Sequence, residues 1–259
     1  MHFYKYQGTG NDFVMIDDRQ ERFNIKDTEL VNHLCNRRFG IGADGLILLR
    51  NHKELDFEMI YYNSDGNLSS MCGNGGRCIA RFAQQLGIIK NNCTFMAVDG
   101  LHEATLNDNE VALKMKDVDA IEISSEFYFL NTGSPHVVKY LDDIASIDII
   151  KEGRAIRYNN RFKAEGTNIN FVSNELDVLR IRTYERGVED ETLSCGTGIT
   201  AAALSNAVQS KMSKGKYETK LKSEGGNLRV SFEYDGLSSF KNIFLIGPAL
   251  KSFEGDFGN

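Results

Sequence analysis

The sequence predicts an α/β fold made of two copies of one unit. Each copy contains a cysteine followed by glycines and then by apolar residues at helical spacing, in residues 70–78 (SMCGNGGRC) and 193–198 (LSCGTG). Cys72 and Cys195 are separated by 195 − 72 = 123 positions. The same offset pairs Gly75 with Gly198, residues 9–11 (TGN) with 132–134 (TGS), and residues 38–39 (RF) with 161–162 (RF). An offset that stays constant across all these segments indicates an internal duplication.

The elements of the first half follow from alternating apolar residues between turn residues. We expect strands at 3–6, 13–16, 46–49, 57–62, 93–98, 103–106 and 111–115. Asp27 is a candidate N-cap for a helix that buries Leu34 and Cys35 and ends at Gly40. Residues 40–45 (GIGADG) match a dinucleotide-binding pattern, but they follow a helix and precede a strand. Because that motif needs the reverse order, we interpret these residues as a turn.

The second half repeats this alternation. We expect strands at 127–130, 137–140, 168–172, 178–184, 217–221, 227–232 and 242–246. A short helix is predicted near 141–150, and a longer helix follows each of the two cysteine segments. We expect the tail, residues 248–257, to return to the first half. The predicted units are therefore residues 1–116 with 248–259, and residues 117–247.

Length, charge and cysteine content exclude several classes of protein. The chain has 259 residues, enough for a sizeable core, and a formal net charge of −6, which disfavours binding to nucleic acid or to anionic membranes. No apolar run approaches the roughly 18 residues of a membrane span, and the first residues lack a signal-peptide core. Five cysteines without a dense framework indicate a reduced, cytoplasmic protein. The five histidines are scattered, so we expect no metal site.

The two cysteine segments suggest acid–base chemistry. A glycine-rich turn that leads into a helix leaves backbone N–H groups at the positive end of the helix dipole. Such a terminus binds a carboxylate and stabilises a cysteine thiolate. Inversion of a stereocentre requires one group to remove a proton and another to supply a proton to the opposite face. Two equivalent thiols, Cys72 and Cys195, meet that requirement, so the sequence predicts a racemase or epimerase.

Several motifs resemble those of the diaminopimelate epimerase family, over the whole length of the chain. They are residues 8–13 (GTGNDF), 63–66 (NSDG), 71–78 (MCGNGGRC), 185–187 (ERG), 191–192 (ET), 195–198 (CGTG), 247–248 (GP) and 253–255 (FEG). The resemblance implies two pseudo-symmetric α/β (α+β) halves, each a curved, mostly antiparallel sheet around a central helix, with the active site in the cleft between them. It also implies a cofactor-independent homodimer, needing no pyridoxal phosphate, that interconverts L,L- and meso-diaminopimelate for lysine and peptidoglycan precursors.

The resemblance also assigns roles to residues. By position, Cys72 resembles the proton donor and Cys195 the acceptor in the L,L-to-meso direction. The implied carboxylate cradle at the reacting centre consists of Gly73, Asn74, Gly196 and Thr197. The residues implied to hold the amino groups and the distal carboxylate are Asn11, Asn63, Asn168, Glu185 and Arg186. A guanidinium suits that carboxylate because it binds the two oxygens together. Ser134 and His136 are predicted neighbours of the site.

Three positions depart from the family pattern. Ser134 stands where many members have asparagine, which shortens the reach of the side chain. Gly45 stands where some members bind substrate through a glutamine, which leaves only backbone contacts. The segment between Arg186 and Cys195 carries one residue more than the usual spacing, around residues 188–190.

Other interpretations of the same residues remain open. Cys72 and Cys195 could be structural thiols, whereas Cys35, Cys78 and Cys93 are expected to be packing residues. Arg77 could be a ligand, but a cation on the surface of its helix is the expectation. The alternative functions are a proline racemase-like enzyme, an isomerase of the phenazine-pathway type, and a non-catalytic redox switch that forms a Cys72–Cys195 disulfide. The paired cysteines argue against the phenazine type, and the Glu185–Arg186 pair favours a substrate that is polar at both ends.

Overall fold

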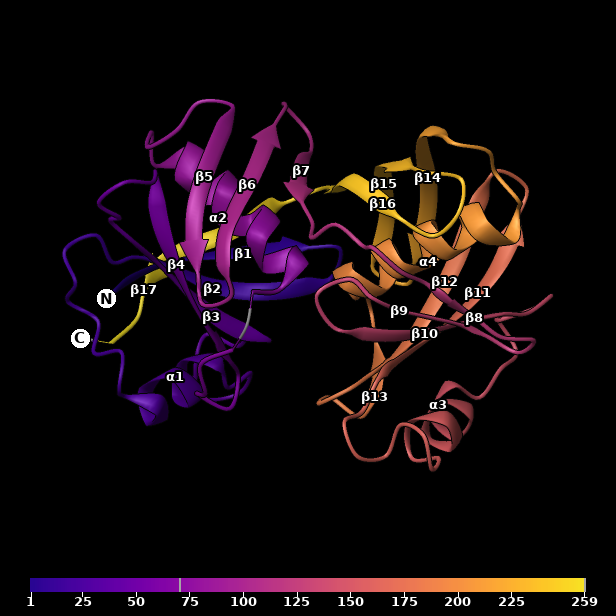
Figure 1. The fold of residues 1–259 in the computed structure, drawn as a ribbon. Coiled ribbons are helices and arrows are strands. Elements are labelled where there is room, and N and C mark those ends of the chain that lie inside the picture. Colours follow the sequence, from indigo (N-terminus) through magenta and orange to yellow (C-terminus); the bar gives the residue numbers. More distant parts are fainter. Residues whose placement is uncertain (70, 259) are drawn as a thin grey trace. The chain divides into compact units, whose positions relative to one another are not determined.

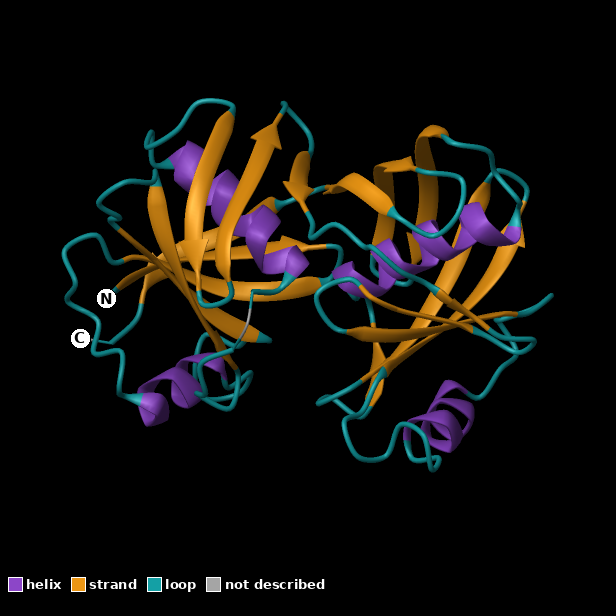
Figure 2. Cartoon of the chain, viewed as in Figure 1, coloured by secondary structure: helices purple, strands orange, loops and turns teal. Residues whose placement is uncertain are grey.

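A computed structural model of the chain describes residues 1–69 and 71–258. Ser70, with which the first cysteine segment begins, and Asn259 lie outside the described residues. The chain divides into two compact units, Met1–Leu113 with Gly247–Asn259, and Lys114–Ile246. Each unit combines a sheet with two helices (Figures 1 and 2). The predicted α+β class is confirmed.

The sheet of the first unit is mostly antiparallel. Its strands, in spatial order, are β17 (Leu250–Asp256), β1 (His2–Gly8), β2 (Asn11–Asp17), β3 (Gly45–Arg50), β4 (Phe57–Asn63), β5 (Asn92–Ala97), β6 (Gly100–Leu106) and β7 (Val111–Lys114). Only the β2–β3 and β4–β5 pairs are parallel, and a helix lies in the chain between the strands of each. Parallel strands need a crossover connection, and a helix is the usual one.

The two helices of the first unit lie against the sheet. The central helix α2 (Gly73–Gln85) is buried along most of its length and contacts β1, β2, β3 and β6 (Figure 1). Helix α1 (Thr28–Cys35) packs Val31, Leu34 and Cys35 onto a core formed with β2 and β3. As predicted, Asp27 caps α1, because its carboxylate accepts a hydrogen bond from the backbone N–H of Leu30 at 2.9 Å.

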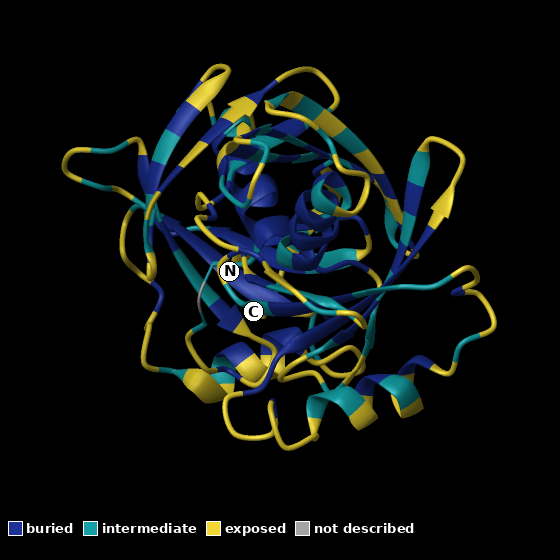
Figure 3. Cartoon of the chain, turned by 45° about the vertical axis from the view of Figure 1, so that its right-hand side comes forward, coloured by how far each residue is buried: buried dark blue, intermediate teal, exposed yellow. Residues whose placement is uncertain are grey.

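The second unit repeats this pattern of pairing. Its strands, in spatial order, are β8 (Glu122–Ile123), β9 (Tyr128–Asn131), β10 (Pro135–Tyr140), β11 (Asn168–Glu175), β12 (Val178–Glu185), β14 (Gly215–Ser223), β15 (Gly226–Tyr234) and β16 (Phe240–Gly247). The β10–β11 and β12–β14 pairs are parallel, and β13 (Asp190–Thr192) folds back onto the end of β12. The central helix α4 (Gly196–Gln209) is buried, and α3 (Ile149–Arg157) covers a core formed with β11 and β12. In both units the loops carry most of the exposed residues (Figure 3).

The strand registers repeat at the offset of the sequence. Phe13 pairs with Gly45 in the first unit, and His136 pairs with Asn168 in the second, an offset of 123 for both partners. The next strand keeps an offset of 122 instead. Leu49 and Val172 are equivalent at 123, but their partners Met59 and Ile181 differ by 181 − 59 = 122. The second unit therefore holds one additional residue between β12 and Cys195. That segment contains β13 and Glu189, whose φ is 58°.

Two predicted helix boundaries are wrong for local reasons. The helix predicted near 141–150 begins only at Ile149, with Asp148 as its N-cap, because the Asp143 carboxylate accepts hydrogen bonds from the Ala145 N–H and the Ser146 hydroxyl and so forms a turn. Helix α1 ends at Cys35 rather than at Gly40. Asn36 leaves the helical conformation, and its side chain accepts from the N–H groups of residues 38 and 39.

A search of the described residues for a helix long and apolar enough to cross a membrane finds none.

Candidate functional site

Each of the two segments places its cysteine immediately before the central helix of its unit. Cys72 is the N-cap of α2 and Cys195 the N-cap of α4, both with extended backbone angles. Cys72 is half-buried and Cys195 is 8% exposed. Neither side chain accepts the usual capping hydrogen bond from the first turn. Each thiol therefore lies at the positive end of a buried helix, where a thiolate is stabilised.

Four predicted residues form the first cysteine site, which we define as Asn11, Cys72, Gly73 and Asn74. The Cys72 Sγ lies 3.5 Å from Asn11 Oδ1, and Asn74 Nδ2 donates to the same oxygen at 3.3 Å. The orientation of the Asn11 amide is fixed because its Nδ2 donates to the Asp44 carboxylate at 2.7 Å, an acceptor only. Asp44 was not among the predicted residues.

The Asp44 carboxylate belongs to a chain of ion pairs. Arg37 bridges Asp44 at 2.8 Å and Asp12 at 2.7 Å, and Lys5 approaches Asp12 at 2.8 Å. Burial acts to raise the pKa of Asp12, but hydrogen bonds from Arg37 and Lys5 outweigh it and lower that pKa to about 2. The four charges balance, and they hold the loop that carries Asp44 against the start of β2.

Arg77 corrects the expectation of a cation on the helix surface. Its side chain is completely buried, at 0% exposed. The guanidinium donates to Asn74 Oδ1 at 3.0 Å and to the Gly73 carbonyl at 3.3 Å. Helical spacing alone does not show that residues 73–80, the first half of α2, are all buried.

Asn63 stands apart from the other predicted residues of the first unit. It ends β4, where it pairs with Gly45, and its side chain is exposed. Among the residues that the structure describes, no hydrogen bond joins Asn63 to Cys72. A side chain at Gly45 would collide with the carbonyl of Tyr62 and the ring of Tyr61, so this strand end has no room for one.

The second cysteine site, which we define as Ser134, His136, Asn168, Cys195, Gly196 and Thr197, joins most of the residues predicted in the second unit. The Cys195 Sγ lies 3.5 Å from Thr197 Oγ1. That hydroxyl contacts His136 Nε2 at 2.9 Å and Ser134 Oγ at 3.2 Å. Asn168 Nδ2 donates to Ser134 Oγ at 3.1 Å. The shorter serine is thus held within one hydrogen-bonded group.

The protonation of His136 follows from its partners. Asn170 Nδ2 donates to His136 Nδ1 at 3.1 Å and to the Val137 carbonyl at 2.9 Å, so Nδ1 is an acceptor and Nε2 carries the proton. Burial, with the nearby charge of Arg186, lowers the pKa of His136 to about 3, and the ring is neutral at pH 7. The Nε2–H can donate to the Thr197 hydroxyl at 2.9 Å or to the Ser134 hydroxyl at 3.0 Å, and the Thr197 hydroxyl can in turn donate to the Cys195 sulfur.

Arg186 and Glu185 follow one another at the end of β12. The Arg186 backbone N–H donates to Asn168 Oδ1 at 2.9 Å, which ties Arg186 to the second cysteine site. Its guanidinium is exposed and donates to the Glu165 carbonyl at 3.0 Å. No carboxylate of the described residues forms an ion pair with it. Glu185 accepts a hydrogen bond from the Thr192 hydroxyl at 2.7 Å, across the β12–β13 pair.

The remaining cysteines are packing residues, as predicted. Cys35, Cys78 and Cys93 are buried, and burial raises the pKa of each thiol to about 12. Within the described part of the chain, no three His, Cys, Asp or Glu side chains are grouped so that they could hold a metal ion.

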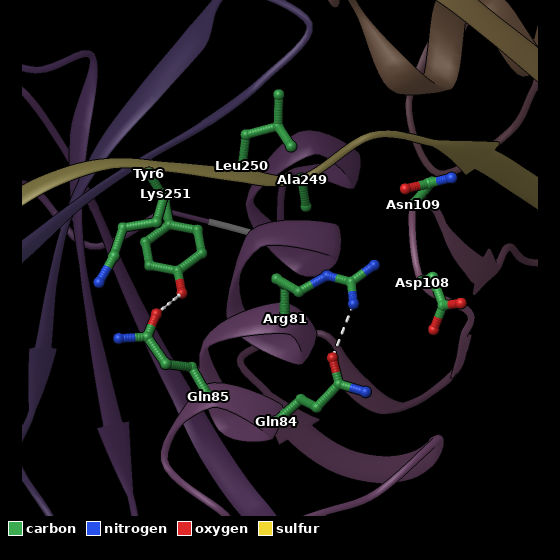
Figure 4. Close-up of a pocket in the computed structure, with 9 residues that line it drawn as sticks. All are labelled: Tyr6, Arg81, Gln84, Gln85, Asp108, Asn109, Ala249, Leu250 and Lys251. Atoms are coloured by element: carbon green, nitrogen blue, oxygen red, sulfur yellow. Dashed lines mark hydrogen bonds between the residues drawn. The ribbon is translucent and has the colours of Figure 1, made fainter.

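A pocket of about 600 Å³ lies elsewhere in the first unit, between the C-terminal half of α2 and β17 (Figure 4). Part of its polar lining is already engaged: Arg81 donates to Gln84 Oε1 at 2.6 Å, and the Tyr6 hydroxyl donates to Gln85. None of the predicted site residues lines this pocket.

Two positioning residues, Asp44 and Asn170, are absent from the predicted site. Asp44 lies in the glycine-rich turn that we interpreted as structural. Asn170 lies two positions after Asn168 on the same face of β11 and is completely buried. Two asparagines at this spacing in an otherwise apolar strand are a signal that could have identified the second one.

Solved structures of other proteins share the fold. A phenazine biosynthesis protein of the PhzF family from Bacillus anthracis superposes with a TM-score of 0.75 at 13% identity, and covers 100% of this chain and 99% of its own. A probable proline racemase from Agrobacterium radiobacter gives a TM-score of 0.71 at 15% identity, and covers 99% of this chain and 92% of its own. At these identities the likeness concerns the fold alone.

Sequence comparison is more specific. The diaminopimelate epimerase from Flavobacterium psychrophilum is 54% identical over 256 residues, which cover 98% of this chain and 99% of that protein. The enzyme of the same name from Aquifex aeolicus is 40% identical, with 98% and 97% covered. A sequence model described as diaminopimelate epimerase matches residues 3–121 and 128–251, which include both helix-capping cysteines. The chain belongs to the diaminopimelate epimerase family.

Proposed function

We propose that this protein interconverts L,L- and meso-2,6-diaminopimelate without a cofactor, using Cys72 and Cys195 as a pair of acid–base groups. The observation that carries the proposal is the equivalence of the two thiols: each is the N-cap of the buried central helix of its unit. The substrate follows from relatives that carry this name over nearly the full length of the chain.

The reaction balances with one thiolate and one thiol. The thiolate takes the α-proton from one face of the substrate carbon, and the electron pair of that C–H bond spreads onto the adjacent carboxylate. The thiol then gives its proton to the opposite face, so the configuration inverts and the two sulfurs have exchanged protonation states. By family position, Cys195 is the acceptor and Cys72 the donor in the L,L-to-meso direction.

The first turns of α2 and α4 are proposed to stabilise the charge that develops on the carboxylate. Gly73 and Asn74 begin α2, and Gly196 and Thr197 begin α4, with their N–H groups at the positive end of each dipole. These donors are in place before the reaction and need no reorganisation when charge develops. A carboxylate bound there is thus stabilised more strongly as the proton leaves.

Thr197 is proposed to have a second role, at the sulfur. In this proposal His136 Nε2 donates to the Thr197 hydroxyl, and that hydroxyl donates to Cys195 Sγ, 3.5 Å away. A donor facing the sulfur favours the thiolate over the thiol. His136 acts here as a neutral orienting group, since its pKa is lowered to about 3.

The far end of the substrate is proposed to bind at Arg186. The guanidinium is exposed and pairs with no carboxylate of the described residues, so it is suited to grip the distal carboxylate of diaminopimelate. The residues proposed to hold the amino groups and the rest of the chain are Asn11, Asn63, Asn168 and Glu185. We further propose a cytoplasmic homodimer, whose product supplies lysine and peptidoglycan synthesis.

A substrate panel tests this function. The purified, reduced protein is incubated with L,L-diaminopimelate, L-proline and trans-4-hydroxy-L-proline, and the isomers are separated by chiral chromatography. Conversion of L,L-diaminopimelate alone supports the proposal. Conversion of a proline substrate instead would assign the chain to the racemase alternative, and no conversion with reduced thiols would favour the redox switch. Light scattering on the same sample gives the oligomeric state.

A further inference from the structure

Arg77 is a buried charge that has no ion-pair partner among the described residues. Its side chain is 0% exposed, and the oxygens to which its guanidinium donates in the described part of the chain are all uncharged. These are Asn74 Oδ1 at 3.0 Å, Thr9 Oγ1 at 3.3 Å, and the carbonyls of Gly73 at 3.3 Å and Pro248 at 3.4 Å. Among the described residues no carboxylate lies within ion-pair distance of it. A buried charge of this kind is costly unless an anion compensates it.

The ionisable groups that interact with Arg77 are two thiols. Burial acts to lower the pKa of Arg77, while Cys78 and Cys72 act to raise it. The Cys78 thiol has a pKa of about 12 and stays neutral at pH 7. Cys72, at the N-terminus of the same helix, is therefore the thiol that can supply a compensating negative charge.

A second group of charged residues is linked to Cys72, but it has no net charge. The link is the Asn11 amide, which donates to the Asp44 carboxylate and lies beside the Cys72 sulfur. Asp44 is compensated by Arg37, and Asp12 by Arg37 and Lys5. Two cations and two anions cancel, so Arg77 is the unbalanced charge beside the first cysteine site.

The second unit provides an internal comparison. At the offset of 123, the equivalent of Arg77 is Thr200, which is also 0% exposed. The Thr200 hydroxyl donates to the Gly196 carbonyl at 3.0 Å, just as Arg77 donates to the carbonyl of Gly73. A neutral side chain thus satisfies this carbonyl in α4. The need to satisfy this carbonyl therefore does not explain why α2 carries a charged side chain at this position.

Arg77 also sets the orientation of the amides beside Cys72. Because a guanidinium only donates, Asn74 must turn its Oδ1 toward Arg77 and its Nδ2 toward Asn11 Oδ1. Asn74 is also one of the residues whose backbone N–H groups form the proposed carboxylate cradle. The charge and the hydrogen bonds of Arg77 therefore act on the same site.

We propose that Arg77 is a positioning residue that supplies the fixed positive charge of the first cysteine site, stabilising the Cys72 thiolate and orienting Asn74. This inference deepens the proposed function, because it concerns the thiol that we expect to exchange protons with substrate. The contact between Cys72 Sγ and Asn11 Oδ1 opposes it by favouring the thiol. We expect the full charge of Arg77, in a buried setting, to outweigh this weak sulfur contact at 3.5 Å.

The experiment measures thiolate formation directly. In a Cys195→Ser background, the rate of alkylation of Cys72 by iodoacetamide is followed against pH, with Arg77 intact and with Arg77→Thr, the residue that α4 carries at this position. We expect the midpoint of the profile to rise by about one pH unit and the rate at pH 7 to fall about tenfold. Arg77→Lys, which keeps the charge, should stay close to the unsubstituted profile.

A matched control uses the other cysteine. In a Cys72→Ser background, Arg77→Thr should leave the alkylation profile of Cys195 unchanged. An unshifted Cys72 profile, or equal shifts at both cysteines, would overturn the proposal. If Arg77→Thr does not fold, Arg77→Gln and Arg77→Lys are compared, and identical profiles for these two variants would overturn it as well. Alkylation requires no substrate, so failure of the proposed function shows separately, as absence of isomerisation by the unsubstituted protein.

Discussion

Gly198 and Gly75 occupy equivalent positions in the first turns of the two central helices, yet replacing each with alanine should have different effects. A Cβ at Gly198 would lie under 3.0 Å from Asn170 Oδ1, which is completely buried. A Cβ at Gly75 would lie 3.1 Å from Ile47 Cδ1 and 3.3 Å from Met59 Cε, the flexible ends of two side chains. The first clash displaces a fixed polar group, whereas the second needs shifts of a few tenths of an ångström.

The magnitude follows from the hydrogen bonds of Asn170. Its amide bonds to His136 Nδ1 at 3.1 Å, to the Val137 carbonyl at 2.9 Å and to the Thr183 hydroxyl at 3.0 Å. Each buried polar group left without a partner costs about 1–3 kcal/mol. Alanine in place of glycine in a helix returns at most about 1 kcal/mol. We therefore expect Gly198→Ala to lower the free energy of unfolding by about 2–4 kcal/mol, and Gly75→Ala to change it by less than about 1 kcal/mol.

Urea unfolding followed by circular dichroism gives both values, provided that the slope m is unchanged. Gly198→Ala should also lower epimerisation, because a displaced Asn170 no longer orients His136. In an Asn170→Ala background the clash is absent, so Gly198→Ala should cost little there. Equal losses for the two glycine variants, or full additivity with Asn170→Ala, would refute the reasoning.

The remaining predictions concern charge and the thiols. Asp12 has a pKa of about 2 in the folded chain, below its unfolded value, so its contribution to the free energy of unfolding is present above about pH 4 and is lost as the pH falls toward 2. Asp12→Asn should therefore lower the free energy of unfolding by about 2 kcal/mol at pH 7. Urea unfolding at pH 7 and at pH 3 should show that the difference between the two proteins is smaller in acid. Arg186→Ala should raise KM for diaminopimelate at least tenfold with a smaller change in kcat, whereas an unchanged kcat/KM would remove Arg186 from the site. Alkylation at pH 7 with peptide mapping should label the two helix-capping cysteines and spare the three buried thiols, whose pKa values are about 12; labelling of any buried thiol would contradict the packing.

Features that depend on neighbours in the sequence were predictable. Asp27 caps α1 because an N-cap needs only a short acceptor before the first turn. Cys72 and Cys195 were placed at helix N-termini because the glycines after them mark that boundary. The predicted start of the helix near 141–150 was wrong for an equally local reason. Asp143 and Asp148 are both acceptable N-caps, but the Asp143 side chain closes a turn instead.

Features that depend on contacts distant in sequence were not predictable from pattern. Asp44 orients Asn11 from a loop 33 residues later, and Asn170 orients His136 from the neighbouring strand. The burial of Arg77 could not be predicted either, because helical spacing does not reveal that the first half of α2 is buried on all its faces. The cysteines that we propose to react could thus be identified from motifs, whereas the residues that orient their neighbours could be identified only from the folded structure.

One measurement tests the two-thiol mechanism most directly: proton NMR of the reduced protein with L,L-diaminopimelate in heavy water. With two acid–base groups, the proton taken from one face differs from the one delivered to the other. We predict that, early in the reaction, deuterium appears at the inverted carbon of the meso product while the remaining L,L substrate keeps its α-protons. Deuterium entering the unreacted L,L substrate as fast as the product would indicate a single base and contradict the account, and so would the absence of any exchange.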